Sequence, residues 1–376
     1  MIGRKTGLVT SHSRIAGLGL ATPAHRIGRT ESVQFAVANT GVGDYRDSKM
    51  AALYRRTGID FRGTVLVDAE DEPGPDAESL RSRLRHPLDH SDRGPSTGDR
   101  MKWYQQFAGQ LASEAAVAGL TAAAVEPEAI THLVVVTCTG FASPGVDYHL
   151  MDALGLPADV QRIQVGFMGC HGAINGLRAV QGICAANPSS VVLMVCVELC
   201  SLHYQYGPQT DRIVSGALFA DGAAALVAQG DDSENWQPSI SGTASYRIPG
   251  TKDDMTWHVG DHGFEMTLRA TVPGIIEQHL PEVLCETLGR FNLSPKDICG
   301  WAVHPGGVRI VDAVKNGMKL NDSQVEDSLE VLRQHGNMSS PTMLFVLERF
   351  IRQQIPRPWL MLGFGPGLAV ELAVIE

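Results

Sequence analysis

One pattern occurs twice in this chain at a single sequence offset, and this repetition most narrows the folds that the chain can adopt. A leucine-methionine pair, a pair that begins with glycine, and a residue at the end of an apolar run each recur at the same distance along the sequence. The matches are Leu193-Met194 with Leu360-Met361, Gly169-Cys170 with Gly336-Asn337, and Thr137 with His304. Chance produces single matches between apolar strands, but it does not readily keep one register three times. We therefore predict two similar halves, residues 1–229 and 230–376.

Apolar runs alternate with segments of helical period along the chain. The runs 131–137, 190–198 and 217–228 are bounded by Gly, Pro, Ser or Thr and are typical of buried strands or strand pairs. The segments 99–120 and 173–187 place apolar residues at helical spacing. Strands that alternate with helices indicate a layered α/β architecture.

The stretch 66–100 departs from this alternation. It is rich in Pro, Gly, Asp and Ser and poor in apolar residues. Because such a composition buries little apolar surface, we expect a surface insertion in the N-terminal half.

Composition excludes several classes of function. The 376 residues carry 31 basic and 41 acidic side chains without a basic run, so we expect no nucleic-acid partner. No segment approaches about 18 unbroken apolar residues, so we expect no membrane span. The seven cysteines include no C-x-x-C pair, which suits neither a disulfide framework nor a zinc ribbon. We therefore expect a cytoplasmic protein with reduced thiols and no bound metal.

The stretch VGFMGCHGAINGLRAV (165–180) places Cys170 where an apolar run gives way to a helical pattern. Most cysteines in cytoplasmic proteins are small buried hydrophobes. Here Gly166, Gly169 and Gly172 allow a sharp turn and a close backbone approach. The helix that follows directs its N-terminal dipole at the sulfur, which favours the thiolate. Cys170 is therefore a candidate nucleophile.

Two residues of the second half complete a candidate site. His304 ends the run WAVHPGG before a Pro-Gly-Gly turn; the alternative is a core histidine with satisfied hydrogen bonds. Asn337 follows a glycine and precedes a helical pattern; the alternative is an ordinary helix N-cap. The segment GFGPG (363–367) predicts a hairpin turn that, beside a thiol, would shape a pocket and direct a backbone N–H at an oxyanion. Because α/β sheets bind ligands at strand ends, we expect Cys170, His304 and Asn337 to lie together.

Together these segments resemble the type III polyketide synthases, the chalcone synthase family of the thiolase superfamily. The resemblance rests on GFMGCHGAINGLR around Cys170, WAVHPGG with His304, GNMSSPTMLF with Asn337, and GFGPG. It runs from about residue 18 to the C-terminus and is weakest over 66–100. It implies the thiolase fold, a five-layered αβαβα sandwich of two similar halves, and an acyltransferase that forms a homodimer.

The resemblance implies a decarboxylative Claisen condensation. Cys170, paired as a thiolate with His304, would accept an acyl starter from coenzyme A. Malonyl-CoA would then lose carbon dioxide, and its enolate, stabilised by His304 and Asn337, would attack the thioester on Cys170. Repetition and ring closure would give a pyrone or a resorcinol-type product. The substrates are an acyl-CoA starter and malonyl-CoA, and no metal, flavin or nicotinamide is implied.

The resemblance also implies a substrate pocket. Cys138 and Thr139 stand where plant members have Thr-Ser, Tyr204 and Met266 correspond to two gatekeeper phenylalanines, and Trp257 replaces a glycine. A flexible methionine passes an alkyl chain more easily than a rigid ring does, which favours a fatty acyl starter over an aromatic one. The implied pocket residues are Cys138, Thr139, Tyr204, Trp257, Met266, Ser339, Gly363, Phe364, Gly365, Pro366 and Gly367.

Two surface features are less constrained by the sequence. Arg56, in LYRRTGID, is the predicted contact for coenzyme A; the alternative is a solvated arginine. Ser143 stands where plant members send a methionine across the dimer interface, so the resemblance does not carry that contact to this chain.

The sequence leaves two other functions open. One is an enzyme like ketoacyl-(acyl carrier protein) synthase III, which condenses once and requires a carrier protein. The other belongs to a different class, a Cys-His-Asn hydrolase or a catalytically silent thiolase-fold scaffold. A cysteine protease would lack both GFGPG and the internal repeat.

Overall fold

The computed structural model describes residues 12–40, 47–67, 84, 87–89, 91–231 and 238–376. Within these residues, nine strands form one mixed sheet in the order β11-β12-β13-β8-β1-β7-β6-β4-β5. The strands are β1 (His12–Ala21), β4 (His132–Thr137), β5 (Gln161–Gly166), β6 (Val191–Leu199), β7 (Asp221–Asp231), β8 (Ser239–Arg247), β11 (Gly300–Val303), β12 (Trp359–Gly365) and β13 (Ala369–Ile375). Two short ladders lie apart from this sheet, β2 (Arg26–Gly28) with β3 (Phe61–Gly63) and β9 (Met255–Gly260) with β10 (Gly263–Leu268).

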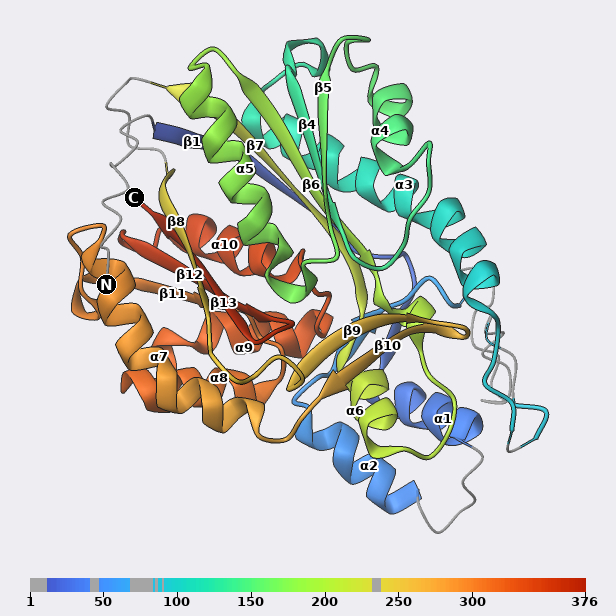
Figure 1. Cartoon of the computed structure of the whole chain (residues 1–376). Helices are drawn as coiled ribbons and strands as arrows, with labels where there is room; N and C mark the ends of the chain where they lie inside the picture. The colour runs from blue at the N-terminus through green and yellow to red at the C-terminus, as the bar shows by residue number, and fades with distance from the viewer. Residues whose placement is uncertain (1–11, 41–46, 68–83, 85–86, 90, 232–237) are drawn as a thin grey trace.

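Helices cover both faces of the sheet and also fill the space between its two parts (Figure 1). They are α1 (Arg29–Thr40), α2 (Asp47–Arg56), α3 (Thr97–Ala123), α4 (Val146–Leu154), α5 (Gly172–Ala186), α6 (Thr210–Leu218), α7 (Val272–Gly289), α8 (Val308–Met318), α9 (Glu326–His335) and α10 (Thr342–Gln353).

Three hydrophobic cores stack these elements in five layers. In the central core, Met194 of β6 and Met361 of β12 face helices α5 and α10. The neighbouring residues point the other way, because side chains alternate along a strand: Leu193 packs with α3 and α4, and Leu360 packs with α7 and α8. The layers are therefore helix, sheet, helix, sheet, helix. The predicted fold, the αβαβα sandwich of the thiolase fold, is confirmed.

The strand order of one half recurs in the other. The order β1-β7-β6-β4 corresponds to β8-β13-β12-β11, and each corresponding pair of neighbours runs in the same relative sense. The two parts of the sheet join through a short antiparallel contact of β1 with β8, at Ser13↔Ile240 and Arg14↔Ser239. The repeated pair Leu193 and Leu360 falls on the corresponding strands β6 and β12. The boundary at residue 230 stays a prediction.

Two local expectations from the sequence concern the run 217–228 and the stretch 66–100. The run 217–228 is not strand throughout, because its first two residues end α6 and β7 begins at Asp221. Both Ala217 and Leu218 are buried, and an apolar run alone does not separate a buried helix end from a strand.

The expected insertion 66–100 lies largely outside the described residues, at 68–83, 85–86 and 90. Its described residues are mixed: Leu66, Leu84 and Arg100 are buried, whereas Leu88, at 79% exposed, and Asp89 lie on the surface.

The elements that cover the site gather on one side of the molecule. Helices α1, α2 and α6 contact one another, and α6 contacts strand β10 of the β9–β10 hairpin. Figure 1 shows this group beside the end of β6 and near the beginning of α5.

Candidate active site

Cys170 lies on a sharp turn between β5 and α5. Phe167 and Gly169 both have positive φ, 56° and 76°. Residues 169–171 form a 3-10 turn that leads directly into α5 at Gly172. The side chain of Cys170 therefore lies just before the first turn of a helix, where the helix dipole favours negative charge. This is the local geometry that the glycine pattern predicted.

Burial nevertheless opposes ionisation of this thiol. Cys170 is 7% exposed, and burial, the largest cause, raises the pKa of its thiol to about 11. Hydrogen bonds with Ser339 and Asn337 oppose that rise, while the charge of Glu198 adds to it. The thiol is therefore protonated at neutral pH, and its pairing as a thiolate with His304 stays a prediction. Proton removal has to accompany the attack on a substrate.

His304 follows β11, with its backbone N–H donating to the carbonyl of Leu362 at 2.8 Å. The side chain is 1% exposed, and neither ring nitrogen meets hydrogen-bond geometry with an atom of the described residues. Burial, helped by the nearby His171, lowers the pKa of His304 to about 3, while the side chain of Asn337 opposes this shift. The imidazole is therefore neutral, and it is not the satisfied core histidine of the alternative interpretation.

Asn337 is placed by the loop between α9 and α10. Its backbone bonds to Leu218 and Ala220, at 2.9 Å each, and fix the loop against the end of α6. Its Oδ1 accepts from the backbone N–H of Ser339 at 2.9 Å, and its Nδ2 donates to the carbonyl of Gly306 at 3.5 Å. Because α10 begins at Thr342, the N-cap alternative is wrong.

The side chain of Asn337 influences the titration of both Cys170 and His304. The structure thus brings the three predicted residues together from two halves of the chain. They come from the loops before α5 and α10 and from the end of β11, which are related positions of the repeated topology.

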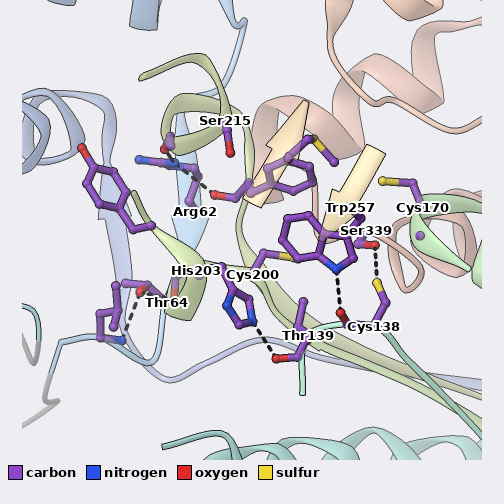
Figure 2. A pocket seen from close by; sticks show the side chains of 18 of the residues that line it. Arg62, Thr64, Cys138, Thr139, Cys170, Cys200, His203, Ser215, Trp257 and Ser339 are labelled. Carbon is purple, nitrogen blue, oxygen red and sulfur yellow. Dashed lines mark hydrogen bonds between the residues drawn. The ribbon is translucent and has the colours of Figure 1, made fainter. Parts of the chain in front are cut away.

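A cavity opens beside Cys170, under the β9–β10 hairpin (Figure 2). The predicted residues that line it are Cys138, Thr139, Cys170, Tyr204, Trp257, Met266, Ser339 and Pro366. Ile27, Phe35, Leu66, Val67 and Met255 make much of the remaining wall apolar. The hydroxyl of Ser339 lies 3.6 Å from the sulfur of Cys138 and also hydrogen-bonds Cys170, so it connects two thiols. His304 and Asn337 are each 1% exposed and do not belong to the lining.

Sequence reasoning missed Glu198, a fully buried carboxylate on β6. It accepts hydrogen bonds from the backbone N–H of Cys138 at 3.0 Å and from the hydroxyls of Thr139 and Ser340, both at 2.8 Å. Burial raises the pKa of this carboxyl. An acid inside the apolar run VVLMVCVELC was the available signal. Glu198 fixes the strand end that carries the first two pocket residues.

The GFGPG segment is the turn between β12 and β13, as predicted, and its glycines make room for the Cys170 turn. A Cβ on Gly169 would lie 2.7 Å from the ring of Pro366, and a Cβ on Gly363 would lie 3.0 Å from the Cβ of His171. Only Pro366 of this segment lines the cavity. Phe364 instead packs in the outer core of the C-terminal half. The other residues predicted for the lining, Gly363, Phe364, Gly365 and Gly367, are absent from it because the pleat and the turn direct them elsewhere.

A second cavity adjoins the first. Phe219 and Met266 line both, and three arginines, Arg56, Arg269 and Arg309, line only the second. The predicted coenzyme A contact, Arg56, therefore lies at a cavity that shares wall residues with the first cavity.

Tyr204 lines the first cavity together with Met266, but unlike Met266 it does not line the second. Its ring packs edge-to-face on Phe35, with centroids 5.1 Å apart, and close to Gly216 of α6. Phe219, the residue that follows the end of α6 at Leu218, lines both cavities.

Among the residues that the structure describes, no group of three or more His, Cys, Asp or Glu side chains is placed to hold a metal ion. Within the same residues, no helix combines the length and apolar character needed to cross a membrane.

Comparison with known proteins agrees with this geometry. Residues 12–232 match the N-terminal domain of chalcone and stilbene synthases, and residues 240–376 match their C-terminal domain. A 1,3,6,8-tetrahydroxynaphthalene synthase of Streptomyces peucetius is 33% identical, over 83% of this chain and 87% of that protein. The α-pyrone synthesis polyketide synthase-like Pks18 of Mycobacterium tuberculosis is 31% identical, over 96% and 90%. The crystal structure of PKS-I from the brown alga Ectocarpus siliculosus superposes with a TM-score of 0.89 at 30% identity, over 98% of both chains. The chain belongs to the chalcone and stilbene synthase family and is a type III polyketide synthase, an acyltransferase that condenses coenzyme A thioesters.

Proposed function

We propose that Cys170 takes an acyl starter from coenzyme A, that malonyl-CoA extends it in repeated decarboxylative condensations, and that the product is a cyclised pyrone or resorcinol. One observation carries this assignment: Asn337 contacts both Cys170 and His304, beside an apolar cavity that adjoins an arginine-lined one. Relatives that are named for α-pyrone and tetrahydroxynaphthalene synthesis support the product class.

In the loading step, His304 acts as the general base. Its ring is neutral, because burial lowers its pKa, and the side chain of Asn337 contacts it. The Cys170 S–H bond breaks as its proton passes to the imidazole, and the sulfur attacks the thioester carbonyl. The bond from that carbonyl to the coenzyme A sulfur then breaks, and the leaving thiolate takes the proton back from His304. The N-terminus of α5 favours the charge that develops on Cys170.

In the extension step, His304 and Asn337 donate hydrogen bonds to the thioester oxygen of malonyl-CoA. The bond to the carboxylate carbon breaks, its electron pair forms the enolate, and carbon dioxide leaves. The enolate carbon then attacks the acyl group on Cys170, whose sulfur leaves and recovers a proton. The amide Nδ2 of Asn337 is available for this task because its contact with Gly306 is long, at 3.5 Å.

The two cavities divide the substrates between them. The guanidinium groups of Arg56, Arg269 and Arg309 suit the phosphates of coenzyme A. The acyl chain then passes Phe219 and Met266 into the apolar inner cavity. We propose a fatty acyl starter, because the flexible methionine at this passage yields to an alkyl chain.

We further propose a cytoplasmic homodimer. All seven cysteines are free thiols, as a reducing compartment requires. Strand β5 lies at the edge of the sheet, and Phe141, Tyr148, Ile163 and Met168 nearby are large exposed apolar side chains, each at least 36% exposed. An unpaired apolar edge favours association with a second copy. Light scattering at micromolar concentration should give twice the mass of 40.4 kDa.

The proposed function is tested by a product assay without carrier protein. The purified protein is incubated with malonyl-CoA and a series of starters, from acetyl-CoA and aromatic CoA esters to C6–C18 acyl-CoAs, and products are identified by mass spectrometry. We expect pyrones or resorcinols that contain several malonyl units from one class of starter. Extension by a single unit, and only from carrier-linked substrates, would contradict the proposal.

A further inference from the structure

His203 connects three parts of the cavity wall, and neither the repeat nor the proposed chemistry uses it. It lies in the 3-10 turn Cys200–His203 after β6, is 4% exposed and lines the cavity. Its Nε2 lies 2.7 Å from the carbonyl oxygen of Thr139, and its Nδ1 accepts from the backbone N–H of Phe264 at 3.0 Å. Because a carbonyl accepts only, Nε2 carries the proton and Nδ1 is the acceptor, so the tautomer is fixed.

The imidazole also packs against the aromatic side chains of the β9–β10 hairpin. It stacks on the ring of Phe264 with centroids 4.1 Å apart and planes inclined by 11°, and it meets the edge of Trp257 at 5.6 Å. The indole N–H of Trp257 donates to the carbonyl of Cys138 at 2.8 Å. Figure 2 shows Trp257 and His203 each joined by a dashed line to the Cys138–Thr139 segment. The hairpin is thus attached to that segment at two points.

The segment that carries His203 is itself held firmly. The guanidinium of Arg100, which is fully buried, donates to the backbone carbonyls of Leu202 and Tyr204, on either side of the histidine. Thr97, on the same helix α3, bonds the hairpin turn through Gly260 and Gly263. Helix α3 therefore fixes both the histidine and the far end of the hairpin. The middle of the hairpin is held by the His203 contacts together with the Trp257–Cys138 bond and with Gln205, whose Nε2 donates to the carbonyl of Phe264 at 3.2 Å.

We propose that His203 is a positioning residue that fastens the β9–β10 hairpin over the cavity and thereby limits which acyl chains fit beneath Trp257 and Met266. The fastening requires a neutral ring, because protonation at Nδ1 would remove the acceptor for the Phe264 N–H. Burial lowers the pKa of His203 to about 3, with Arg100 acting in the same direction, so the ring stays neutral across the working pH range. The consequence for acyl chains rests on the proposed function; the fastening itself does not.

Three substitutions separate the two hydrogen bonds. His203→Asn places an amide oxygen near Nδ1 and keeps the acceptor for Phe264, while His203→Gln places an amide N–H near Nε2 and keeps the donor to Thr139. His203→Phe keeps the stacking and removes both bonds. His258→Phe is the matched control, because His258 lies on the same hairpin but is exposed on its outer side.

The first measurement is amide hydrogen exchange of the peptide that covers residues 255–268, which requires no substrate. With a hydrogen bond contributing a typical net stabilisation, we expect exchange to become about fivefold faster in the Phe and Gln variants and to change little in the Asn variant. The control should match the parent protein. Unchanged exchange in His203→Phe, or an equal increase in His258→Phe, would overturn the fastening.

The second measurement is acyl loading from a chain-length series of acyl-CoAs, followed by intact-protein mass. We expect His203→Phe to load acyl chains that are at least two methylene pairs longer than those the parent protein accepts, or that are bulkier. The loading rate for the best starter of the parent protein should change at most twofold. An unchanged length profile in a variant with faster exchange would overturn the specificity role. A parent protein that loads no starter would overturn the proposed function, and the specificity role with it, while the exchange data would still decide the fastening.

Discussion

Replacing Glu198 by alanine should be among the most destabilising substitutions in the active-site wall. The carboxylate is fully buried and accepts from the Cys138 N–H and from the hydroxyls of Thr139 and Ser340 at 2.8–3.0 Å. A hydrogen bond to a charged group contributes about 1.5–3 kcal/mol, and a donor that loses its acceptor in the interior retains its desolvation penalty. Because contacts within one hydrogen-bond network are not additive, the total is less than the sum of the single contributions. We therefore expect Glu198→Ala to lower the free energy of unfolding by about 4 kcal/mol.

That figure converts to a measurable shift in melting temperature. Unfolding entropy at the midpoint is about 2.1 cal/mol/K per residue, or about 0.8 kcal/mol/K for 376 residues, so Tm should fall by about 5 °C. Differential scanning calorimetry at pH 7 provides the measurement. Glu198→Gln keeps an acceptor for the strand end and should change Tm by about 1 °C at most. Glu282→Ala, at an exposed position on α7, is the matched control.

The pH dependence gives a second check on the same residue. Burial raises the pKa of Glu198, so the folded protein holds this proton more tightly than the unfolded chain does. Stability from this group is therefore lost as pH rises above the ordinary carboxyl range. Glu198→Gln lacks that loss and should gain on the parent as pH increases. A decrease of less than 1 °C in Glu198→Ala, or an equal decrease in both variants, would refute the reasoning.

Three further predictions concern the thiol and the substrate passage. Gly169→Ala should slow acyl loading at least tenfold, because φ of Gly169 is 76° and the new Cβ would lie 2.7 Å from Pro366. A stopped-flow assay of released coenzyme A measures the loading rate. Gly274→Ala is the control, because a Cβ at Gly274 would meet no atom within 4 Å. Arg56→Ala should raise the KM for acyl-CoA about tenfold and leave kcat unchanged, because the substitution removes about one ion pair with a phosphate of coenzyme A. A decrease in kcat with unchanged KM would contradict this role of Arg56. Alkylation of Cys170 by iodoacetamide should become about tenfold faster per pH unit from pH 7 to about 10. The reason is that only the thiolate reacts and burial raises the pKa of the thiol to about 11. A rate that reaches a plateau near pH 8 would contradict a pKa this high.

The sequence was most informative where local pattern and topology agree. Because the two halves share one strand order, residues at one offset fall on related positions, and this placed Cys170 and Asn337 before the central helices α5 and α10. The nearly unbroken apolar run 190–198 likewise predicted a buried strand, and β6 is buried on both faces.

The remaining features depend on contacts between segments that are far apart in the chain. That Phe219 lines both cavities depends on where α6 ends, which the apolar run around it does not specify. The protonation of Cys170 depends on how completely the other half covers it. The partners of Glu198 and His203 come from other strands and loops. The apolar run around Glu198 marks it as unusual but does not name those partners, and His203 has no local pattern that would distinguish it.

The account depends most directly on Cys170 as the residue that carries the growing chain. The decisive measurement is peptide-level mass spectrometry after brief incubation with a starter acyl-CoA in the absence of malonyl-CoA, in the parent, Cys170→Ala and Cys138→Ala proteins. We predict one acyl group on the peptide that contains Cys170 in the parent and in Cys138→Ala, and none in Cys170→Ala. An acyl group on Cys138 or Cys200, or one that persists in Cys170→Ala, would contradict the account.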